Sequence, residues 1–336
     1  MFDQNTDYDE YSDEYSDEYL NEYSGEYADE YSDEYADDSK RDTHRLKRKS
    51  KRFKHSYAEL APALAEPDKT NQREFRPSFT GSKHERQWIM EYLGPFYDDN
   101  VITDVLRQVK GGKEATVYCC SANPALGVDL IAAKVYRPRM FRQLRNDAVY
   151  RRGREMIDPE GKEARGRREK LAMRKKTDFG QVLRHTTWLA NEFQTLQRLH
   201  AAGADVPKPF ASSDNAILME YVGDASFPAP ALSQVRLEPH AAHLLWKRLM
   251  ENVELMLENN CVHSDLSAYN VLYWDGHAKI IDLPQAVDPY VNPEAFILLG
   301  RDIDRLCQHF DRYGVNSDPG QITRDLWEHH ILRSKQ

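Results

Sequence analysis

The sequence predicts an α+β fold of two lobes, with strands dominating the first part of the folded chain and helices the second. Short apolar segments with strand composition gather between residues 101 and 136, whereas most of the long segments with helical apolar spacing lie after residue 186. The chain has 336 residues, of which 40% are hydrophobic, so it can bury the core of one large domain or of two lobes.

An acidic tail precedes the folded part. Residues 1–38 hold 16 Asp and Glu and no Lys or Arg, and without them the net charge changes from −9 to +7. Tyrosine recurs every fourth residue from Tyr11 to Tyr35, a period too short for a solenoid repeat. Like charges on adjacent turns oppose a helix here, so we expect a disordered tail. It either solubilises the chain or binds a basic surface, including one of its own domain.

Residues 39–82 are interpreted as a basic arm and linker. Lys40–Lys54 contains nine Lys and Arg in fifteen positions, which fits a nucleic-acid-binding arm, a partner for the acidic tail, or a solvated linker. Three prolines in Ala61–Ser78 indicate a linker, and the folded domain is expected to begin near Lys83 and to run through 83–336.

The first lobe is expected to span about 83–222. Its first predicted elements are a short helix at Glu85–Leu93 and three strands at Val101–Val109, Ala115–Cys120 and Leu130–Tyr136. A longer helix at Thr186–Ala202 and a buried strand at Ala216–Val222 follow. Residues 137–176 interrupt it with 15 basic against 6 acidic residues, which predicts either a flexible insert or charged helices.

The second lobe, about 223–336, is expected to be mainly helical. Pro239–Asn259 has the strongest helical pattern, with an apolar face of Leu245, Leu249, Val253, Met256 and Leu257. A hairpin of Val271–Trp274 and Lys279–Ile281 follows, turned by Asp275-Gly276. One helix then starts at Asn292-Pro293, with Phe296, Leu299, Ile303, Leu306 and Phe310 on one face, and a last helix runs from Pro319 to Leu332.

Composition also bears on location. No apolar run approaches the roughly 18–20 residues of a membrane span, and the acidic N-terminus does not resemble a secretory signal. The four cysteines form no CxxC pair, which argues against a zinc site or a disulfide framework. We therefore expect a cytoplasmic protein.

The segment His263-Ser-Asp-Leu-Ser-Ala-Tyr-Asn270 follows the long helix, and Asp282 ends an apolar strand twelve residues later. Phosphoryl transfer from ATP uses a carboxylate that orients the attacking hydroxyl, together with an amide oxygen and a second carboxylate that hold magnesium. Asp265, Asn270 and Asp282 supply these groups in that order. Each residue alone could be an ordinary turn or strand-end residue, but the set and its spacing favour a catalytic site.

Lys134 lies on the apolar strand predicted at Leu130–Tyr136, so its ammonium group must reach solvent or pair with an acid. In the kinase arrangement such a lysine binds phosphate and pairs with a glutamate of a neighbouring helix. Glu192 is the candidate, because it neighbours Leu189 and Leu196 on the helix. The alternatives are an edge-strand charge for Lys134 and a solvated position for Glu192.

A glycine-containing turn, Gly111-Gly-Lys-Glu-Ala115, separates the first two strands. It matches neither the Walker A pattern GxxxxGK[ST] nor the full GxGxxG. Alone it predicts a hairpin turn; just before the strand of Lys134 it suggests a short loop that covers phosphates.

The segments GKEATVY, AAKVYR, HSDLSAYN and IIDLPQAVD together resemble the RIO family of atypical serine/threonine protein kinases, over roughly Glu85 to Gly314. The resemblance is closest to the first branch of the family, in a bacterial-like form, since no winged-helix segment is evident before the kinase part. It implies a protein-kinase-like fold with an antiparallel sheet and a helix in the N-lobe and a helical C-lobe. It also implies ATP, magnesium, serine autophosphorylation and, in archaea and eukaryotes, a role in small-subunit ribosome maturation.

The resemblance assigns roles residue by residue. Asp265 would be the catalytic aspartate, with Lys134 contacting phosphate and Asp282 taking part in the chemistry. Asn270 and Asp282 would be the metal ligands. The remaining ATP-binding positions would be Gly112, Lys113, Glu114, Ala115, Val117 and Glu192, with Met219, Glu220 and Val222 as the adenine hinge.

Departures from ordinary kinases leave the peptide-binding platform undefined. Ser264 stands where HRD has arginine, Asp282-Leu-Pro replaces DFG, and no APE motif follows. Four functions stay open: a serine/threonine kinase, an ATPase switch, a small-molecule kinase and an inactive scaffold. The ATPase switch would phosphorylate Asp282 and would bind ribosomal RNA or pre-ribosomal particles through segments 40–54 and 137–176. The absence of any gap among the catalytic positions argues against the scaffold.

Overall fold

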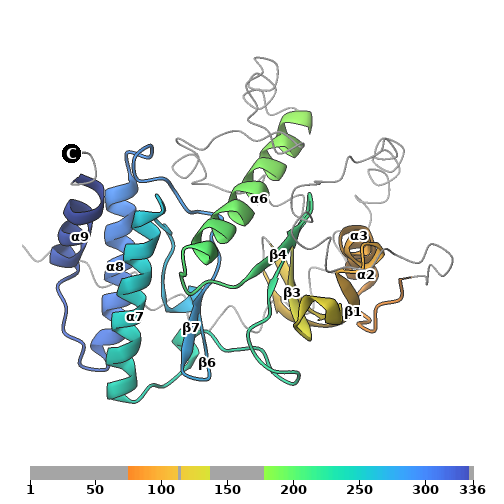
Figure 1. The fold of residues 1–336 in the computed structure, drawn as a ribbon, viewed down its shortest axis with the longest axis horizontal. Coiled ribbons are helices and arrows are strands. Elements are labelled where there is room, and N and C mark those ends of the chain that lie inside the picture. Colours follow the sequence, from red (N-terminus) through yellow and green to blue (C-terminus); the bar gives the residue numbers. More distant parts are fainter. Residues whose placement is uncertain (1–74, 113–114, 137–177, 333–336) are drawn as a thin grey trace, which may run out of the picture. The chain divides into compact units, whose positions relative to one another are not determined.

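A computed structural model describes residues 75–112, 115–136 and 178–332 (Figure 1). The predicted tail at 1–38, most of the arm and linker at 39–82, the insert at 137–176, and Lys113 and Glu114 lie outside the described residues. No helix among the described residues is long and apolar enough to cross a membrane.

A five-stranded antiparallel sheet forms the first lobe, in the order β1-β2-β3-β5-β4, which confirms the expected sheet and the α+β class. The strands are β1 (Ile102–Gly111), β2 (Ala115–Ala122), β3 (Leu130–Tyr136), β4 (Pro209–Ser212) and β5 (Ala216–Glu220), with a short turn η2 (Pro124–Leu126) between β2 and β3. The sequence did not predict β4, because it has four residues and begins with proline, which cannot donate to a ladder.

Strand β3 shows how the sheet separates a packed face from a face that carries the site. Ile131, Ala133 and Val135 belong to the core cluster that includes the N-terminal helices. Ala132 and Lys134 alternate with them and therefore point to the opposite face. A lysine within an apolar strand is tolerated because it lies on this second face.

The N-terminal helices cover the first face of the sheet. They are α2 (Lys83–Trp88), a wider turn η1 (Ile89–Leu93) and α3 (Gly94–Asp98). A reciprocal capping box between Ser82 and Glu85 fixes the start of α2. Packing begins eight residues before Lys83, the expected domain start, because Phe75 is buried and stacks 4.6 Å from Tyr97.

Helix α6 (Asp178–Ala201) packs against β4 and β5. It starts earlier than the predicted Thr186. Its predicted apolar face is confirmed, since Leu189, Phe193, Leu196 and Leu199 are all buried in the large core cluster. This packing turns the neighbouring Glu192 inward.

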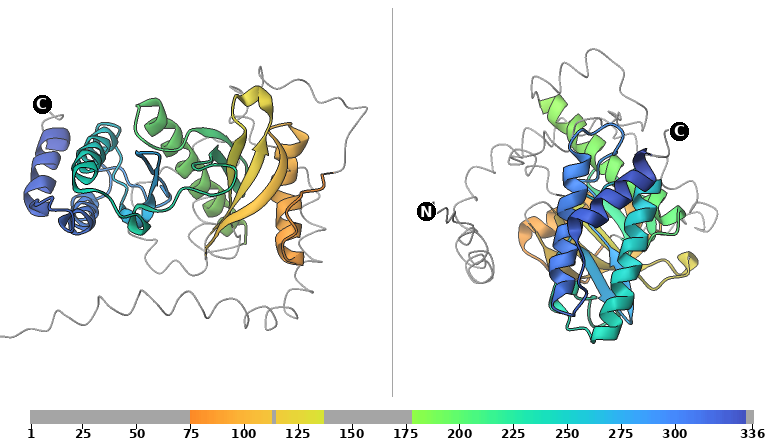
Figure 2. Two further views of the ribbon diagram at one scale, coloured as in Figure 1. Left: turned by 90° about the horizontal axis from the view of Figure 1, so that it is seen from below. Right: turned by 90° about the vertical axis from the view of Figure 1, so that its left-hand side faces the viewer.

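The second lobe is mainly helical, as expected. Figure 1 and Figure 2 show α7 and α8 side by side, and α9 packs against α8. The elements are η4 (Leu232–Gln234), α7 (Pro239–Glu258), η5 (Ala268–Asn270), the hairpin β6 (Val271–Trp274) and β7 (His277–Ile280), α8 (Ala295–Asp311), α9 (Pro319–Trp327) and η6 (Glu328–Leu332). All five residues of the predicted apolar face of α7 are buried.

Helix α8 differs from its prediction at its first turn. It begins at Ala295, and Phe296, expected on the core face, is 40% exposed, with its ring 5.4 Å from Trp327 of α9. The buried face instead starts with Ala295, Leu298 and Leu299, because these side chains lie over the core cluster. The four cysteines are buried free thiols, consistent with the lack of a disulfide pattern.

Candidate functional site

The site is centred on Lys134 of β3, which bridges two carboxylates from distant parts of the chain. Its Nζ lies 2.8 Å from Glu192 Oε1 and 2.6 Å from Asp282 Oδ1. Burial lowers the pKa of Lys134, but the carboxylates of Asp282 and Glu192 raise it by more, so the pKa lies well above its ordinary value. Lys134 is therefore a permanent cation at this point.

Glu192 is the buried partner of that cation, at 5% exposure. Its second carboxylate oxygen accepts a hydrogen bond from the Tyr136 hydroxyl. Burial raises the pKa of Glu192 above its ordinary value, and the charge of Lys134 opposes this rise. The pair joins α6 to the sheet, as the sequence predicted for these two residues.

Asp302 of α8 anchors the loop that carries Asp265. Asp302 Oδ2 accepts from the Ser264 backbone N–H at 2.7 Å, and Oδ1 accepts from the Leu266 N–H at 2.8 Å. Ser264 adopts a left-handed backbone conformation, with φ of 71°. Such a conformation is unfavourable for serine and persists only where surrounding contacts fix it.

Asp302 is almost completely buried, at 2% exposure. Burial raises the pKa of Asp302, and the hydrogen bonds from the two backbone N–H groups lower it by less, so that the pKa is about 7. Its position under the loop makes it a structural anchor, because both of its oxygens are used by backbone groups that flank Asp265.

Asp265 itself has two side-chain partners. Arg305 Nη1 donates to Asp265 Oδ1 at 2.8 Å, and Asn270 Nδ2 donates to Oδ2 at 3.2 Å. Asn270 Nδ2 also donates to the Asp265 carbonyl at 2.9 Å. The carboxylate is thus fixed in orientation while its side chain stays 37% exposed, which an acceptor hydroxyl requires.

His263 and Asn270 join the Asp282 segment to the loop that carries Asp265. His263 Nδ1 accepts from the Asp265 N–H at 3.3 Å, so its Nε2 carries the proton and donates to the Ile281 carbonyl at 3.0 Å. Burial lowers the pKa of His263, which keeps the ring neutral. In addition, the Ile281 N–H donates to the Asn270 carbonyl at 2.9 Å.

Asp282 follows directly, with a left-handed backbone φ of 72°. Burial raises its pKa and the adjacent Lys134 lowers it by more, so its pKa lies below the ordinary value. Its carboxylate is ionised at neutral pH.

The oxygens of Asn270 and Asp282 fit a magnesium ion. In the described part of the chain no hydrogen bond uses Asn270 Oδ1 or Asp282 Oδ2, so each residue offers an unengaged oxygen, the ligand type that magnesium prefers. The described residues contain no cluster of three or more His, Cys, Asp and Glu suited to a metal. An ion held here would take its other ligands from phosphate oxygens and water.

The glycine turn closes the β1–β2 hairpin at the sheet edge. The Gly112 N–H donates to the Ala115 carbonyl at 3.0 Å, and a Cβ at position 112 would lie 2.9 Å from that oxygen. Glycine is therefore needed for the turn. Val117 lies directly opposite Lys134 in the β2–β3 pairing.

Next to Lys134, the sheet carries a small apolar cluster: Cys119, Ala132 and Tyr221 are buried, with Leu106, Val109, Val117, Leu130 and Met219 packed against them. Ala132 stands two residues before Lys134 and shares its face. This cluster offers an apolar surface beside a cation.

The predicted hinge leaves β5 at Glu220. The Glu220 carboxylate accepts from Lys279 Nζ of β7 and from the Lys208 N–H, each at 3.0 Å. The Glu220 N–H donates to the Lys208 carbonyl, and the Val222 carbonyl accepts from the Ala229 N–H. These contacts fix the hinge backbone to both neighbouring segments.

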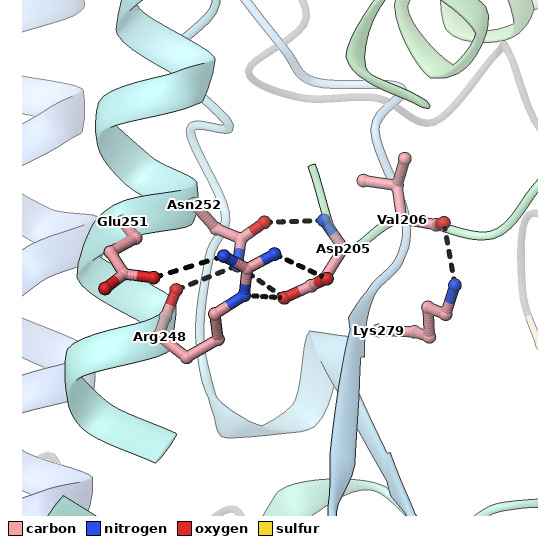
Figure 3. Close-up of polar contacts among 6 residues, drawn as sticks. All are labelled: Asp205, Val206, Arg248, Glu251, Asn252 and Lys279. Atoms are coloured by element: carbon pink, nitrogen blue, oxygen red, sulfur yellow. Dashed lines mark hydrogen bonds and ion pairs between the residues drawn. The ribbon is translucent and has the colours of Figure 1, made fainter. Parts of the chain in front are cut away.

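A polar network beside the hinge joins the α6–β4 loop to the second lobe (Figure 3). Arg248 of α7 holds both Asp205 oxygens, at 2.6 and 3.0 Å, and the buried Asn252 donates to Asp205 Oδ2 at 2.8 Å. Lys279 Nζ lies 3.4 Å from the Val206 carbonyl. The loop after α6 is thereby anchored to α7 and β7.

Sequence reasoning proposed Lys134, Glu192, Asp265, Asn270 and Asp282. The structure pairs Lys134 with Glu192 and Asp282, and Asn270 with Asp265. A backbone hydrogen bond from Ile281 to Asn270 links the two groups. It missed Asp302 and Arg305, although acidic and basic residues on the apolar helix 295–311 were a possible signal. It also missed Tyr136 and Ala132, which the two-residue period of β3 places on the face of Lys134.

Comparisons with known proteins identify the family of the chain. A family model described as the RIO domain matches residues 148–322, a range that contains Glu192, Asp265 and Asp282 but not Lys134. The chain belongs to the RIO domain family.

Proteins named RIO-type serine/threonine-protein kinase Rio1 are among its relatives. The one from Haloferax volcanii is 36% identical over 215 residues, which cover 62% of this chain and 64% of that protein. The one from Thermoplasma acidophilum is 35% identical over 137 residues, 40% of this chain and 69% of that protein. Human serine/threonine-protein kinase RIO1 is 32% identical over 130 residues, 38% of this chain and 23% of that protein.

Several of these relatives are thus matched over only part of their length. Relatives named RIO3 also match, such as the one from Bos taurus at 32% identity. The assignment to the first branch stays a prediction.

Proposed function

We propose that this chain is an ATP- and magnesium-dependent serine/threonine protein kinase of the RIO type that also phosphorylates itself. The observation that carries the proposal is the convergence of Lys134 with Glu192 and Asp282, beside a fixed Asp265–Asn270 pair. A buried permanent cation next to carboxylate and amide oxygens is the arrangement that phosphoryl transfer requires. The relatives named serine/threonine-protein kinase support the protein class of the acceptor.

ATP would lie between the sheet and the Asp282 segment. The adenine would rest on the apolar cluster that includes Val117 and Ala132, with Met219, Glu220 and Val222 as the hinge that offers backbone hydrogen bonds. Lys134 would bind phosphate oxygens, and the turn Gly112–Ala115, with Lys113 and Glu114, would cover them. Asn270 and Asp282 would hold magnesium, which neutralises charge on the phosphates when bound.

The chemical step would take place at Asp265. The carboxylate orients the acceptor hydroxyl and accepts its proton as the hydroxyl oxygen forms a bond to the γ-phosphorus. The bond from that phosphorus to the β,γ-bridging oxygen breaks, and ADP leaves with the electron pair. Asn270, which donates to both the Asp265 carboxylate and the Asp265 carbonyl, helps to keep the carboxylate in place and so reduces the reorganisation that the step requires.

An ATPase switch is the second candidate, favoured by the Asp282 carboxylate, which is 41% exposed and has one unengaged oxygen. In that reaction an Asp282 oxygen attacks the γ-phosphorus, ADP leaves, and water later hydrolyses the acyl phosphate. Segments 40–54 and 137–176 would then bind ribosomal RNA or a pre-ribosomal particle through phosphate contacts. Either activity fits a cytoplasmic protein with free thiols, which we also propose.

The test is incubation of the full chain with γ-labelled ATP and magnesium, following protein label and free phosphate together. We expect label on protein that survives acid and hydroxylamine and that disappears in Asp265→Ala, while Asp311→Ala, a change at an exposed acid of α8, retains it. Hydroxylamine-labile label with steady phosphate release would establish the ATPase switch instead. Transfer to aminoglycosides or choline, but not to protein, would establish a small-molecule kinase.

A further inference from the structure

Arg305 is the cation nearest to the carboxylate of Asp265 in the described part of the chain. Its Nη1 lies 2.8 Å from Asp265 Oδ1, and it comes from α8, forty residues further along the chain. The loop His263–Asn270 has the sequence HSDLSAYN and contains no lysine or arginine. The positive charge beside Asp265 is therefore supplied by a helix and not by the loop.

Other nearby cations are committed to different partners. Lys134 pairs with Glu192 and Asp282. Arg301, one turn before Arg305, donates to the Ser264 carbonyl at 3.1 Å and so supports the backbone of the loop. Among the described residues, Arg305 is the one that forms an ion pair with the Asp265 side chain. The other guanidinium donors of Arg305 have no partner among the described residues.

The pair contributes little to folding stability. Arg305 is 41% exposed and Asp265 is 37% exposed, and ion pairs between such exposed side chains are weak and screened by salt. A contact that does little for stability but holds the side chain central to the reaction points to a role in the reaction.

The Arg305 guanidinium lies close to the position that an acceptor hydroxyl would occupy. An acceptor hydroxyl that binds Asp265 Oδ1 lies roughly 3 Å from that oxygen. The hydroxyl oxygen then lies within about 6 Å of Arg305 Nη1, which is 2.8 Å from the same Oδ1. Negative charge on a phosphoryl group in transfer to that oxygen is stabilised by a preorganised cation at this range, and more strongly when water is excluded.

We propose that Arg305 is the positioning residue of the catalytic loop: it holds the Asp265 carboxylate in its reactive orientation and supplies the positive charge that the loop lacks. This inference rests on the proposed kinase function, since it concerns the same aspartate. It predicts an effect on turnover and not on ATP binding, because among the described residues the hydrogen bond and the ion pair of Arg305 are with Asp265, which is not one of the residues proposed to hold ATP.

The experiment compares Arg305→Ala, Arg305→Lys and Arg305→Gln with wild type and Asp265→Ala. The matched control is Arg312→Ala, an exposed arginine immediately after α8. Steady-state phosphoryl transfer gives kcat and KM, and a fluorescent ATP analogue gives a nucleotide Kd independently of activity. Thermal unfolding checks that each variant is folded.

We expect kcat of Arg305→Ala to fall about 10- to 100-fold, which is below the roughly 100- to 1,000-fold loss seen when a donor in direct contact with the reacting group is removed, because Arg305 acts through Asp265. KM for ATP and the nucleotide Kd should change less than about twofold. Arg305→Lys should recover part of kcat, because it keeps the charge but loses the planar fork, while Arg305→Gln should not. Arg312→Ala should match wild type.

The outcomes separate the two proposals. If wild type transfers no phosphate to protein, the proposed function fails and the inference fails with it. If wild type is active and Arg305→Ala equals it in kcat, the inference alone is overturned. A weaker nucleotide Kd with unchanged kcat also overturns it. If Arg305→Ala unfolds, Arg305→Gln and Arg305→Lys decide, and equal kcat in these two variants contradicts the role of the charge.

Discussion

Lys134 and Glu192 depend on each other in the folded chain. The lysine side chain is 13% exposed and the glutamate side chain 5%. The Tyr136 hydroxyl donates a hydrogen bond to the second oxygen of the Glu192 carboxylate. A buried charge that loses its partner is costly, whereas a pair removed together is often tolerated. Lys134, which is proposed to bind phosphate, is therefore also needed to compensate the buried charge of Glu192, and its loss alone should destabilise the first lobe.

We expect Lys134→Met to abolish phosphoryl transfer and to lower the free energy of unfolding by about 3 kcal/mol, since Glu192 stays buried without its cation. The double variant Lys134→Met/Glu192→Gln should recover more than half of that stability but no activity. Urea unfolding measures this. Lys279→Met is the control, because its pair with Glu220 is more exposed and should cost under about 1 kcal/mol. Equal stability of Lys134→Met and wild type would contradict the coupling.

Asp302 gives a pH-dependent prediction at the same scale. Its pKa is about 7 in the folded chain and about 4 in an unfolded chain. Between these values the folded state binds the proton and the unfolded state does not, so this group's contribution to stability decreases as pH rises from about 4 to about 7. Below that window its contribution is at its most favourable, and above it the carboxylate is ionised in both states.

The measurement is urea unfolding of wild type and Asp302→Asn from pH 4.5 to 8, because the difference between them removes the contributions of other groups such as His309, whose pKa burial lowers to about 4. We expect the stability of wild type relative to the variant to fall across this range. Asp311→Asn, at an exposed position of α8, is the control for the substitution itself. A difference that is flat or rises with pH would contradict the raised pKa of Asp302 in the folded chain.

At the scale of elements, the site exists because turns and loops fix where strands and helices meet. The β1–β2 turn depends on Gly112, the loop after α6 on Asp205, Arg248 and Asn252, and the Asp265 loop on Asp302. None of these anchoring groups is proposed to take part in the reaction itself. Changes in them should therefore act on binding or stability.

Gly112→Val is expected to raise KM for ATP about tenfold, with a smaller effect on kcat. The added Cβ would meet the Ala115 carbonyl at 2.9 Å, and the turn proposed to cover the phosphates must open. Steady-state kinetics and the nucleotide Kd measure the effect. Gly94→Ala is the control, because a Cβ there meets nothing within 4 Å and its φ of −50° is helical. An unchanged KM would remove the turn from the ATP site.

At the scale of the whole molecule, charge is unevenly distributed along the chain. The first 38 residues carry 16 acidic groups, while the remaining residues have a net charge of +7. An acidic segment competes with external polyanions for the basic groups of the same chain, and salt weakens both interactions. The tail is therefore a candidate regulator of the RNA binding that is proposed for the basic segments.

Deletion of residues 1–38 should raise affinity for a single-stranded RNA several-fold at about 50 mM salt, and the gain should shrink at about 300 mM. Fluorescence anisotropy across a salt series measures both. A variant in which the acidic residues of the tail are replaced by Asn and Gln keeps its length and should behave like the deletion. Equal affinity of all three proteins would exclude masking by the tail.

The sequence alone determined the fold class, and it was enough to propose five residues of the candidate site, because both depend on local patterns. The apolar composition of β3, the apolar faces of α6 and α7, and the fixed spacing of Asp265, Asn270 and Asp282 are all visible within short windows. Where the pattern was weak, as in β4 or at Phe296, the prediction missed the strand or the face.

Only the tertiary structure identified Asp302, Arg305 and Tyr136 as parts of the site. Asp302 contacts backbone groups 36 and 38 residues away, Arg305 contacts Asp265 across 40 residues, and Tyr136 reaches Glu192 across 56. A charged residue on an amphipathic helix has the same local pattern whether it faces water or a catalytic loop. Which of the two it faces is decided by how the helix packs against the rest of the core, and that packing depends on contacts between residues far apart in the chain.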